Sequence, residues 1–288
     1  MSSLAGNGCD VLVPFSERKP LIEIERSITS TYRKHIWSKF IKAIKTYNLV
    51  EEGDKVAVAV SGGKDSLLMA KLFQQLKKCR EINFTVEFIA MDPGYHENIR
   101  QLLIDNCNYL EIPIHLYESG IFEVADRIAK DYPCYMCAKM RRGSLYSKAQ
   151  ELGCNKMALG HHFNDVIETT LLNVLYSGNY KTMLPKLKSD NFEKLELIRP
   201  LYLIEEEHIQ KFTQNSGIWA LNCACMVSAK KIANKRYEIK DMIKELKKTF
   251  PDVDKSIFRS AQNVSLDSIL GWQKDGKNYS YLDFYDEE

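Results

Sequence analysis

The stretch Val56-Ala57-Val58-Ala59-Val60-Ser61-Gly62-Gly63-Lys64-Asp65-Ser66 decides the fold class of this chain. Its β-branched apolar run predicts a buried strand, its two glycines predict a tight turn, and residues 67–76 are compatible with a helix. Glycines let backbone N–H groups approach a ligand, and a helix N-terminus carries partial positive charge. Such a concave set of N–H groups favours phosphate. The pattern is not a Walker A loop, because Asp65 follows Lys64 and Val58 occupies the place of the first glycine.

Segments with the pattern of strands alternate with segments that have the pattern of helices. Further strands are expected at 84–91, 113–117, 156–160 and 195–203, and helices at 27–47, 97–110, 122–132, 139–153, 165–176, 205–216 and 228–250. This order predicts an α/β fold, a Rossmann-like doubly wound parallel sheet with added N- and C-terminal helices. Ligands bind such sheets beyond the carboxyl ends of the strands. Ser61, Met91, Gly160 and His161 fall there, as a nucleotide site requires.

Composition divides the chain into three parts. Residues 1–30 are expected to form a weakly ordered arm, and residues 31–225 a nucleotide-binding domain that includes the N-terminal helix. Residues 226–288 are expected to form a basic helical segment that ends in an acidic tail. Within the domain, the polar and basic residues 181–194 predict a loop or hairpin.

The length of 288 residues is enough for one α/β domain with a full core. No signal peptide is apparent, and no apolar stretch approaches the ~20 residues that span a bilayer. These features predict a soluble, cytoplasmic protein with no membrane contact. The formal net charge is only +2, so affinity for nucleic acid must come from local basic patches.

Two groups of cysteines have the spacing of metal ligands. Cys134 and Cys137 form a C-x-x-C pair, and Cys223 and Cys225 form a C-x-C pair later in the chain. A lone C-x-x-C fits half of a zinc site, a redox dithiol or part of an iron–sulfur ligand set. Two cysteines plus one would hold three irons of a [4Fe–4S] cluster and leave the fourth open, whereas two plus two would give a Cys₄ zinc site.

The isolated cysteines call for no chemistry. Cys79, Cys107 and Cys154 are interpreted as small buried apolar residues, and Cys9 as incidental.

Positive side chains gather in clusters that we expect to contact RNA phosphates. The residues are Lys139, Arg141, Arg142, Lys186, Lys230, Lys231, Lys235 and Arg236. For the 228–250 helix taken alone, a solvated surface helix explains the same charges.

The phrase Ser-Gly-Gly-Lys-Asp-Ser at 61–66 resembles the PP-loop of ATP pyrophosphatases, which cleave ATP to AMP and pyrophosphate. The resemblance implies that residues Ser61, Gly62, Gly63, Lys64, Asp65 and Ser66 hold the β- and γ-phosphates. It also implies that Lys64 neutralises charge and that Asp65 helps to hold Mg²⁺.

Further phrases resemble the tRNA 2-thiocytidine biosynthesis family within that superfamily. They span residues 35–265 and include residues 48–54, 134–146, 158–169, 183–187, 199–201 and 260–264. The resemblance implies an adenine nucleotide α-hydrolase-like fold. It also implies an ATP-dependent enzyme that replaces the C2 oxygen of a tRNA pyrimidine, in close relatives cytidine 32, with sulfur.

The same resemblance assigns the site residues. Cys134, Cys137 and Cys225 become the ligands of a [4Fe–4S] cluster, with Cys223 as the alternative third ligand. Asp165 joins Asp65 around Mg²⁺, so that Lys64, Asp65 and Asp165 are the catalytic set. Met91, Gly160 and His161 are expected near the nucleotide, Met91 by analogy of fold. Asn164 stands where the family has an acid.

The expected chemistry follows from the poor reactivity of a cytosine C2 carbonyl. Adenylylating its oxygen creates AMP as a leaving group, and sulfide from a cysteine desulfurase or another source then displaces it. The chain is expected to bind tRNA and is compatible with a homodimer. The alternatives are a 2-thiouridine synthetase of the sister group, a cluster-free persulfide or lysidine-type ligase, and a zinc-bearing RNA-binding protein without catalysis.

Overall fold

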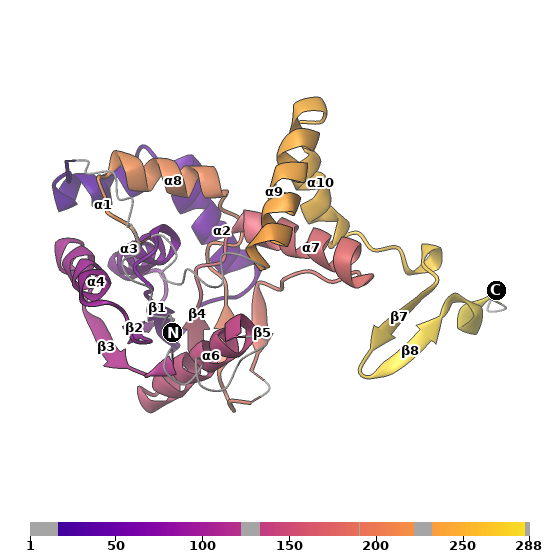
Figure 1. Cartoon of the computed structure of the whole chain (residues 1–288), viewed down its shortest axis with the longest axis horizontal. Coiled ribbons are helices and arrows are strands. Elements are labelled where there is room, and N and C mark those ends of the chain that lie inside the picture. The colour runs from indigo at the N-terminus through magenta and orange to yellow at the C-terminus, as the bar shows by residue number, and fades with distance from the viewer. Residues whose placement is uncertain (1–16, 122–132, 190, 222–231, 286–288) are drawn as a thin grey trace.

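The computed structural model describes residues 17–121, 133–189, 191–221 and 232–285, and within these the side chains of 133–138 and 232–234 fall outside the description (Figure 1). Six strands form one sheet in the order β3-β2-β1-β4-β6-β5. They are β1 (Lys55–Ala59), β2 (Thr85–Asp92), β3 (Ile114–Glu118), β4 (Lys156–Ala158), β5 (Lys186–Lys188) and β6 (Glu196–Ile198). All neighbours are parallel except β5 and β6, which confirms the predicted α/β fold with a doubly wound sheet.

The order of the strands places a topological switch point between β1 and β4. From β1 the chain moves outward on one side through β2 and β3, then returns to add β4 on the other side of β1. Loops that follow neighbouring strands therefore diverge at this point and leave a crevice at the carboxyl edge of the sheet. The Ser61–Ser66 loop follows β1, and the turn with Gly160 follows β4.

Alternation along β1 builds a core on each face of the sheet. Val56 and Val58 are fully buried in the larger apolar cluster, whereas Ala57 is buried in a second one. The larger cluster takes side chains from α1 (Leu21–Thr29), α2 (Ser38–Thr46), α3 (Lys64–Cys79), α4 (Glu97–Tyr109) and α8 (Glu206–Asn215). The second takes Tyr146 and Ala149 from α6 (Pro133–Glu151).

A third apolar cluster joins three helices beside the sheet. Phe163 and Ile167 of α7 (Phe163–Ser177) pack with Ile239 and Ile243 of α9 (Ile232–Thr249), and α10 (Val253–Ser260) completes the group. Figure 1 shows these helices together, with α10 alongside α9. The helix α10 is not among the elements that we expected from the sequence.

The expectation of a weakly ordered arm up to residue 30 is wrong for residues 21–29. These residues form α1, whose Ile24 and Ile28 are buried in the larger core. A π-helical turn, Arg33–Trp37, then separates α1 from α2, so the single helix expected over 27–47 is interrupted. Residues 1–16 of the arm, and the helix expected over 122–132, lie outside the described residues.

The C-terminal part contains a hairpin that was not among the expected elements. Strands β7 (Gly271–Lys274) and β8 (Lys277–Ser280) pair antiparallel, and Asp275 and Gly276 form the turn with positive φ angles of 52° and 76°. The ring of Trp272 stacks on that of Tyr279 at 5.5 Å between centroids. The hairpin projects away from the sheet domain in Figure 1. Among the described helices, none combines the length and apolarity that crossing a bilayer requires.

A buried ion pair fastens α1 to α3. The Lys71 side chain is 1% exposed, and its Nζ lies 2.7 Å from Glu25 Oε1 and 3.0 Å from the carbonyl oxygen of Leu110. The other oxygen of Glu25 accepts from Lys78 at 2.6 Å. Burial lowers the pKa of Lys71, and the contact with Glu25 opposes that effect. The carboxylate is therefore the group that keeps a buried ammonium charged.

We expect Glu25→Gln to lower the free energy of unfolding by about 2 kcal/mol, because it leaves the ammonium of Lys71 buried without a counter-charge. The double variant Glu25→Gln/Lys71→Met should recover part of this loss. Urea unfolding measures both values, with Glu23→Gln on the exposed side of α1 as the control. Equal losses in the Glu25 and Glu23 variants would contradict the role of the pair.

Candidate functional site

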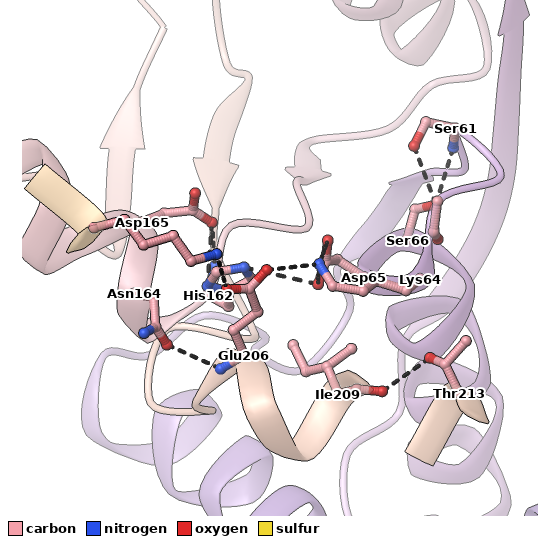
Figure 2. A network of polar contacts seen from close by, with 12 residues as sticks. Ser61, Lys64, Asp65, Ser66, His162, Asn164, Asp165, Glu206, Ile209 and Thr213 are labelled. Carbon is pink, nitrogen blue, oxygen red and sulfur yellow. Dashed lines mark hydrogen bonds and ion pairs between the residues drawn. The ribbon is translucent and has the colours of Figure 1, made fainter. Parts of the chain in front are cut away.

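The loop after β1 is closed by the side chain of Ser66. Its Oγ accepts from the Ser61 N–H at 3.1 Å, lies 3.2 Å from Ser61 Oγ and donates to the Gly63 carbonyl at 2.9 Å (Figure 2). Gly63 is the N-cap of α3 and has no side chain to accept from the first turn. The N–H groups at the start of α3 therefore face the crevice without a capping side chain, an arrangement that suits an anion.

Two glycines allow close approaches around this loop. Gly62 has a φ of +81°, and a Cβ there would lie 2.5 Å from Leu221 Cδ1. The Leu221 N–H donates to the Gly62 carbonyl at 2.9 Å, so the chain just before residue 222 is hydrogen-bonded to the loop. A Cβ on Gly160 would lie 3.4 Å from both the Cβ of Asp65 and the backbone nitrogen of Ser66. The turn after β4 therefore rests directly against the start of α3.

Lys64 is held between two carboxylates that come from different helices. Its Nζ lies 2.9 Å from Asp65 Oδ2 and 3.3 Å from Glu206 Oε1 (Figure 2). Burial alone would lower the pKa of Lys64, but the two carboxylates outweigh it and raise the pKa. The side chain remains 25% exposed, so a charged ammonium stands at the opening of the crevice.

The imidazole of His162 lies between Asp65 and Asp165. His162 Nε2 is 3.8 Å from Asp65 Oδ1, and Nδ1 is 3.4 Å from Asp165 Oδ2. The backbone N–H of His162 also donates to Asp165 Oδ2 at 2.9 Å. The structure thus brings together the two acids expected around Mg²⁺, with a histidine ring in the space that separates them.

Three helices begin at this crevice. Lys64, Phe163 and Glu206 are the first residues of α3, α7 and α8, and the ion pairs above connect their ends. Asn164 of α7 holds the start of α8, because its Oδ1 accepts from the Glu206 N–H at 2.9 Å. The residue that departs from the family's acid is therefore a cap for α8. Converging helix N-termini add positive potential to the site.

Two cations of α9 reach the same network. Arg236 Nη1 lies 3.3 Å from Asp165 Oδ1, and Lys240 Nζ lies 2.5 Å from Glu206 Oε2. Lys240 and Lys64 offset the burial of Glu206 and lower its pKa to about 2. Arg236, which we expected to bind RNA, is thus engaged with acids of the crevice.

Polar nitrogens without hydrogen-bond partners lie near the end of β4. Among them are Nδ1 of His161 and Nε of Arg199, both buried, within the described part of the chain. Burial lowers the pKa of His161 to about 4, so the ring is neutral at pH 7. Buried polar atoms are normally paired, so these two fit a site that receives a polar ligand. Met91 is buried at the end of β2, within the sheet.

The expected cluster ligands are only partly within the description. Residues 134 and 137 belong to the first turn of α6, which begins at Pro133 and so starts earlier than expected. The side chains of Cys134 and Cys137 lie outside the described part, as do Cys223, Cys225, Lys230 and Lys231.

The isolated cysteines differ in their exposure. Cys107 and Cys154 are buried, and burial raises the pKa of their thiols to about 12 and about 11, respectively. They remain protonated thiols, as an apolar role requires. The expectation is wrong for Cys79, which is exposed.

The remaining basic residues occupy different environments. Lys139 and Arg142 are exposed on α6 and Arg141 is half-buried there, while Lys235 Nζ lies 4.7 Å above the ring of Tyr176. Lys186 Nζ lies 3.1 Å from Glu196 and 3.3 Å from Glu51, beside the buried Lys156. These ion pairs give Lys186 a role within the fold, and its expected contact with RNA stays a prediction.

Sequence reasoning missed Glu206, Glu168 and Lys240 as residues of this network. In the sequence, the Glu205-Glu206-Glu207 run is typical of the acidic first turn of the helix expected at 205–216. What marks these carboxyl groups as part of a site is their burial, and this arises only where segments far apart in the chain pack together.

We expect Asn164→Ala to lower the free energy of unfolding by about 1 kcal/mol, because the first turn of α8 loses a hydrogen-bond acceptor. Asn164→Asp keeps an acceptor and should cost less than the alanine variant. Thermal unfolding of both variants measures the difference. A loss in the aspartate variant as large as in the alanine variant would argue against capping.

Comparison with known proteins agrees with this geometry. Residues 32–221 match the model of the PP-loop domain family. The chain is 36% identical to the tRNA-cytidine(32) 2-sulfurtransferase of Pelobacter propionicus over 82% of its own length and 87% of that protein. It is 38% identical to the enzyme of that name from Acinetobacter baumannii over 77% of its length and 74% of that protein.

A solved structure shares the fold. The U34-tRNA thiolase NcsA from Methanococcus maripaludis, determined with its [4Fe–4S] cluster, superposes with a TM-score of 0.64 at 24% identity. The match covers 83% of this chain and 84% of that one. The sequence relatives carry the assignment, and this chain belongs to the tRNA-cytidine(32) 2-sulfurtransferase family of PP-loop proteins.

Proposed function

We propose that this chain replaces the C2 oxygen of cytidine 32 in tRNA with sulfur, at the expense of ATP. Membership of the family supports the substrate and the reaction. The observation that carries the proposal is the uncapped start of α3 with Lys64 beside it, at the switch point of a parallel sheet. This arrangement suits the phosphates of a nucleotide.

The described residues account for the first half of the reaction. Ser61 to Ser66 would receive the β- and γ-phosphates while the C2 oxygen attacks the α-phosphate and pyrophosphate leaves. Lys64 and the N-termini of α3, α7 and α8 would offset the charge that develops during the transfer. The C2–O bond then breaks as sulfide adds, and the former carbonyl oxygen departs with AMP.

Magnesium is the ion that we propose at Asp65 and Asp165. Their carboxylates are hard oxygen donors of the kind that Mg²⁺ takes, usually with several waters and substrate phosphates. In the structure Asp65 pairs with Lys64, and Asp165 with Arg236. Both acids would therefore exchange a cationic side chain for the ion when the nucleotide enters.

An iron–sulfur cluster is proposed on Cys134, Cys137 and Cys225, with Cys223 as the alternative third ligand. Cysteine thiolates are the donors that such clusters require, and when bound the cluster would hold the sulfide that a separate donor delivers. The hydrogen bond from the Leu221 N–H to the Gly62 carbonyl supports a position of the cluster near the ATP phosphates. Cys223 follows Leu221 by two positions, and each position extends the chain by at most ~3.6 Å.

The remaining partners follow from this chemistry. Lys139, Arg141 and Arg142 are the described candidates for contacts with tRNA phosphates, next to the first turn of α6. A cysteine desulfurase or another donor would deliver sulfide. Met91, Gly160 and His161 would lie near the nucleotide.

Deleting the gene should remove 2-thiocytidine from digested tRNA, as measured by nucleoside mass spectrometry. Complementation with the wild-type chain should restore it, and Lys64→Ala should not. If the deletion removes a 2-thiouridine and leaves 2-thiocytidine intact, the substrate is a uridine, as in the sister group, and the choice of cytidine is wrong.

Separate alanine variants of the paired cysteines test the cluster. Cys134→Ala, Cys137→Ala and either Cys223→Ala or Cys225→Ala should lose iron after anaerobic reconstitution. The same variants should lose thiolation, while ATP binding is kept. Cys79→Ala is the control, because Cys79 is exposed and far along α3 from its N-terminus. Full iron content in all four variants would contradict the proposed ligands.

A further inference from the structure

Helix α9 has a fixed position beside the crevice. Its Ile239 and Ile243 are 0% and 6% exposed and pack against Phe163 and Ile167 of α7. Arg236 and Lys240 each precede one of these isoleucines by three residues, so they lie on the adjoining side of the same helix. Apolar packing of α9 therefore holds both cations next to the start of α7.

Arg236 is oriented by three side chains of α7. Its Nε lies 3.4 Å from Glu168 Oε2, Nη1 lies 3.3 Å from Asp165 Oδ1, and Nη2 donates to Thr169 Oγ1 at 3.3 Å. A guanidinium has five N–H donors, so three contacts leave two. The side chain is 42% exposed, and burial raises the pKa of its Glu168 partner to about 7.

Lys240 is separated from Lys64 by a single carboxylate. Glu206 Oε2 lies 2.5 Å from Lys240 Nζ, and Oε1 lies 3.3 Å from Lys64 Nζ. The Glu206 side chain is 15% exposed, so little water screens the two contacts. Glu206 thus links the ammonium of Lys240, on α9, to the phosphate loop.

The contacts form a continuous chain of polar side chains that begins and ends on α9. It passes through Lys240, Glu206, Lys64, Asp65, His162, Asp165 and Arg236. A triphosphate at the loop adds negative charge and attracts Lys64. The ion pair between Lys64 and Glu206 is weakened as a result. The other cations paired with acids of this network are Arg236 and Lys240 of α9, and Arg236 has two N–H groups to spare.

We propose that Arg236 and Lys240 are phosphate-binding residues of the ATP site, so that α9 forms one wall of that site. This inference rests on the proposed use of ATP by the Ser61–Ser66 loop. It differs from the expectation that the positive charge of this helix serves RNA. The exposed lysines farther along α9, such as Lys244, have no contact with the crevice among the described interactions.

Calorimetric titration with a non-hydrolysable ATP analogue, with Mg²⁺ and without RNA, tests the proposal. Arg236→Met and Lys240→Met keep the aliphatic stems but remove the charge. Each should weaken binding by about 10-fold or more, the value of a charge-assisted hydrogen bond. Lys244→Met on the same helix is the matched control and should bind the analogue as the wild type does.

The number of phosphates separates contact from a structural effect. If the two residues touch phosphates, the variants should lose more affinity for the ATP analogue than for AMP, whereas a loosened α9 would weaken both alike. Equal affinity for the analogue in wild type and variants, with only tRNA binding reduced, would overturn the inference alone. No binding by the wild type would overturn the proposed function and the inference with it.

Discussion

The half-buried ammonium of Lys64 is the constraint on which the arrangement of the site depends. A charge in this position needs counter-charges, and Asp65 and Glu206 supply them from two helices. Glu206 in turn needs Lys240, and Asp65 lies near His162 and through it near Asp165. Electrostatic pairing therefore requires α3, α7, α8 and α9 to begin or pass within one small region.

The sheet supplies the region where this pairing can occur. Strand order places the ends of β1 and β4 side by side, and Gly160 permits the turn after β4 to rest on the start of α3. The apolar cluster of Phe163, Ile167, Ile239 and Ile243 then fixes α9. Packing sets where the helices lie, and charge sets how their ends face one another.

Local patterns made much of this predictable from the sequence. The apolar run at Val56, the Gly62–Gly63 pair and the alternation of elements predict the sheet, the loop and the edge that carries the site. The pairs of Glu206 with Lys64 and of Arg236 with Asp165 were beyond such reasoning, because the second spans 71 residues and has no periodicity. The Asp275-Gly276 turn, by contrast, was a local hairpin signal that we missed.

Asn164 shows how a departure from the family pattern is accommodated. Its amide keeps the acceptor that caps α8 and removes a negative charge from a crevice that already holds Asp165, Glu168 and Glu206. With Asp65 these make four carboxylates facing three cationic side chains of the network, so a neutral residue at position 164 avoids a fifth and lowers the repulsion among the acids.

The distribution of the site along the chain has a consequence for synthesis on the ribosome. The phosphate loop is complete when residue 66 has been added, but Glu206, Leu221, Arg236 and Lys240 follow 140 or more residues later. Until then Lys64 has Asp65 as its neighbour but lacks the α8 carboxylate, and Gly62 lacks its hydrogen bond from Leu221. The nascent polypeptide thus carries an incomplete phosphate site until Lys240 has been synthesised.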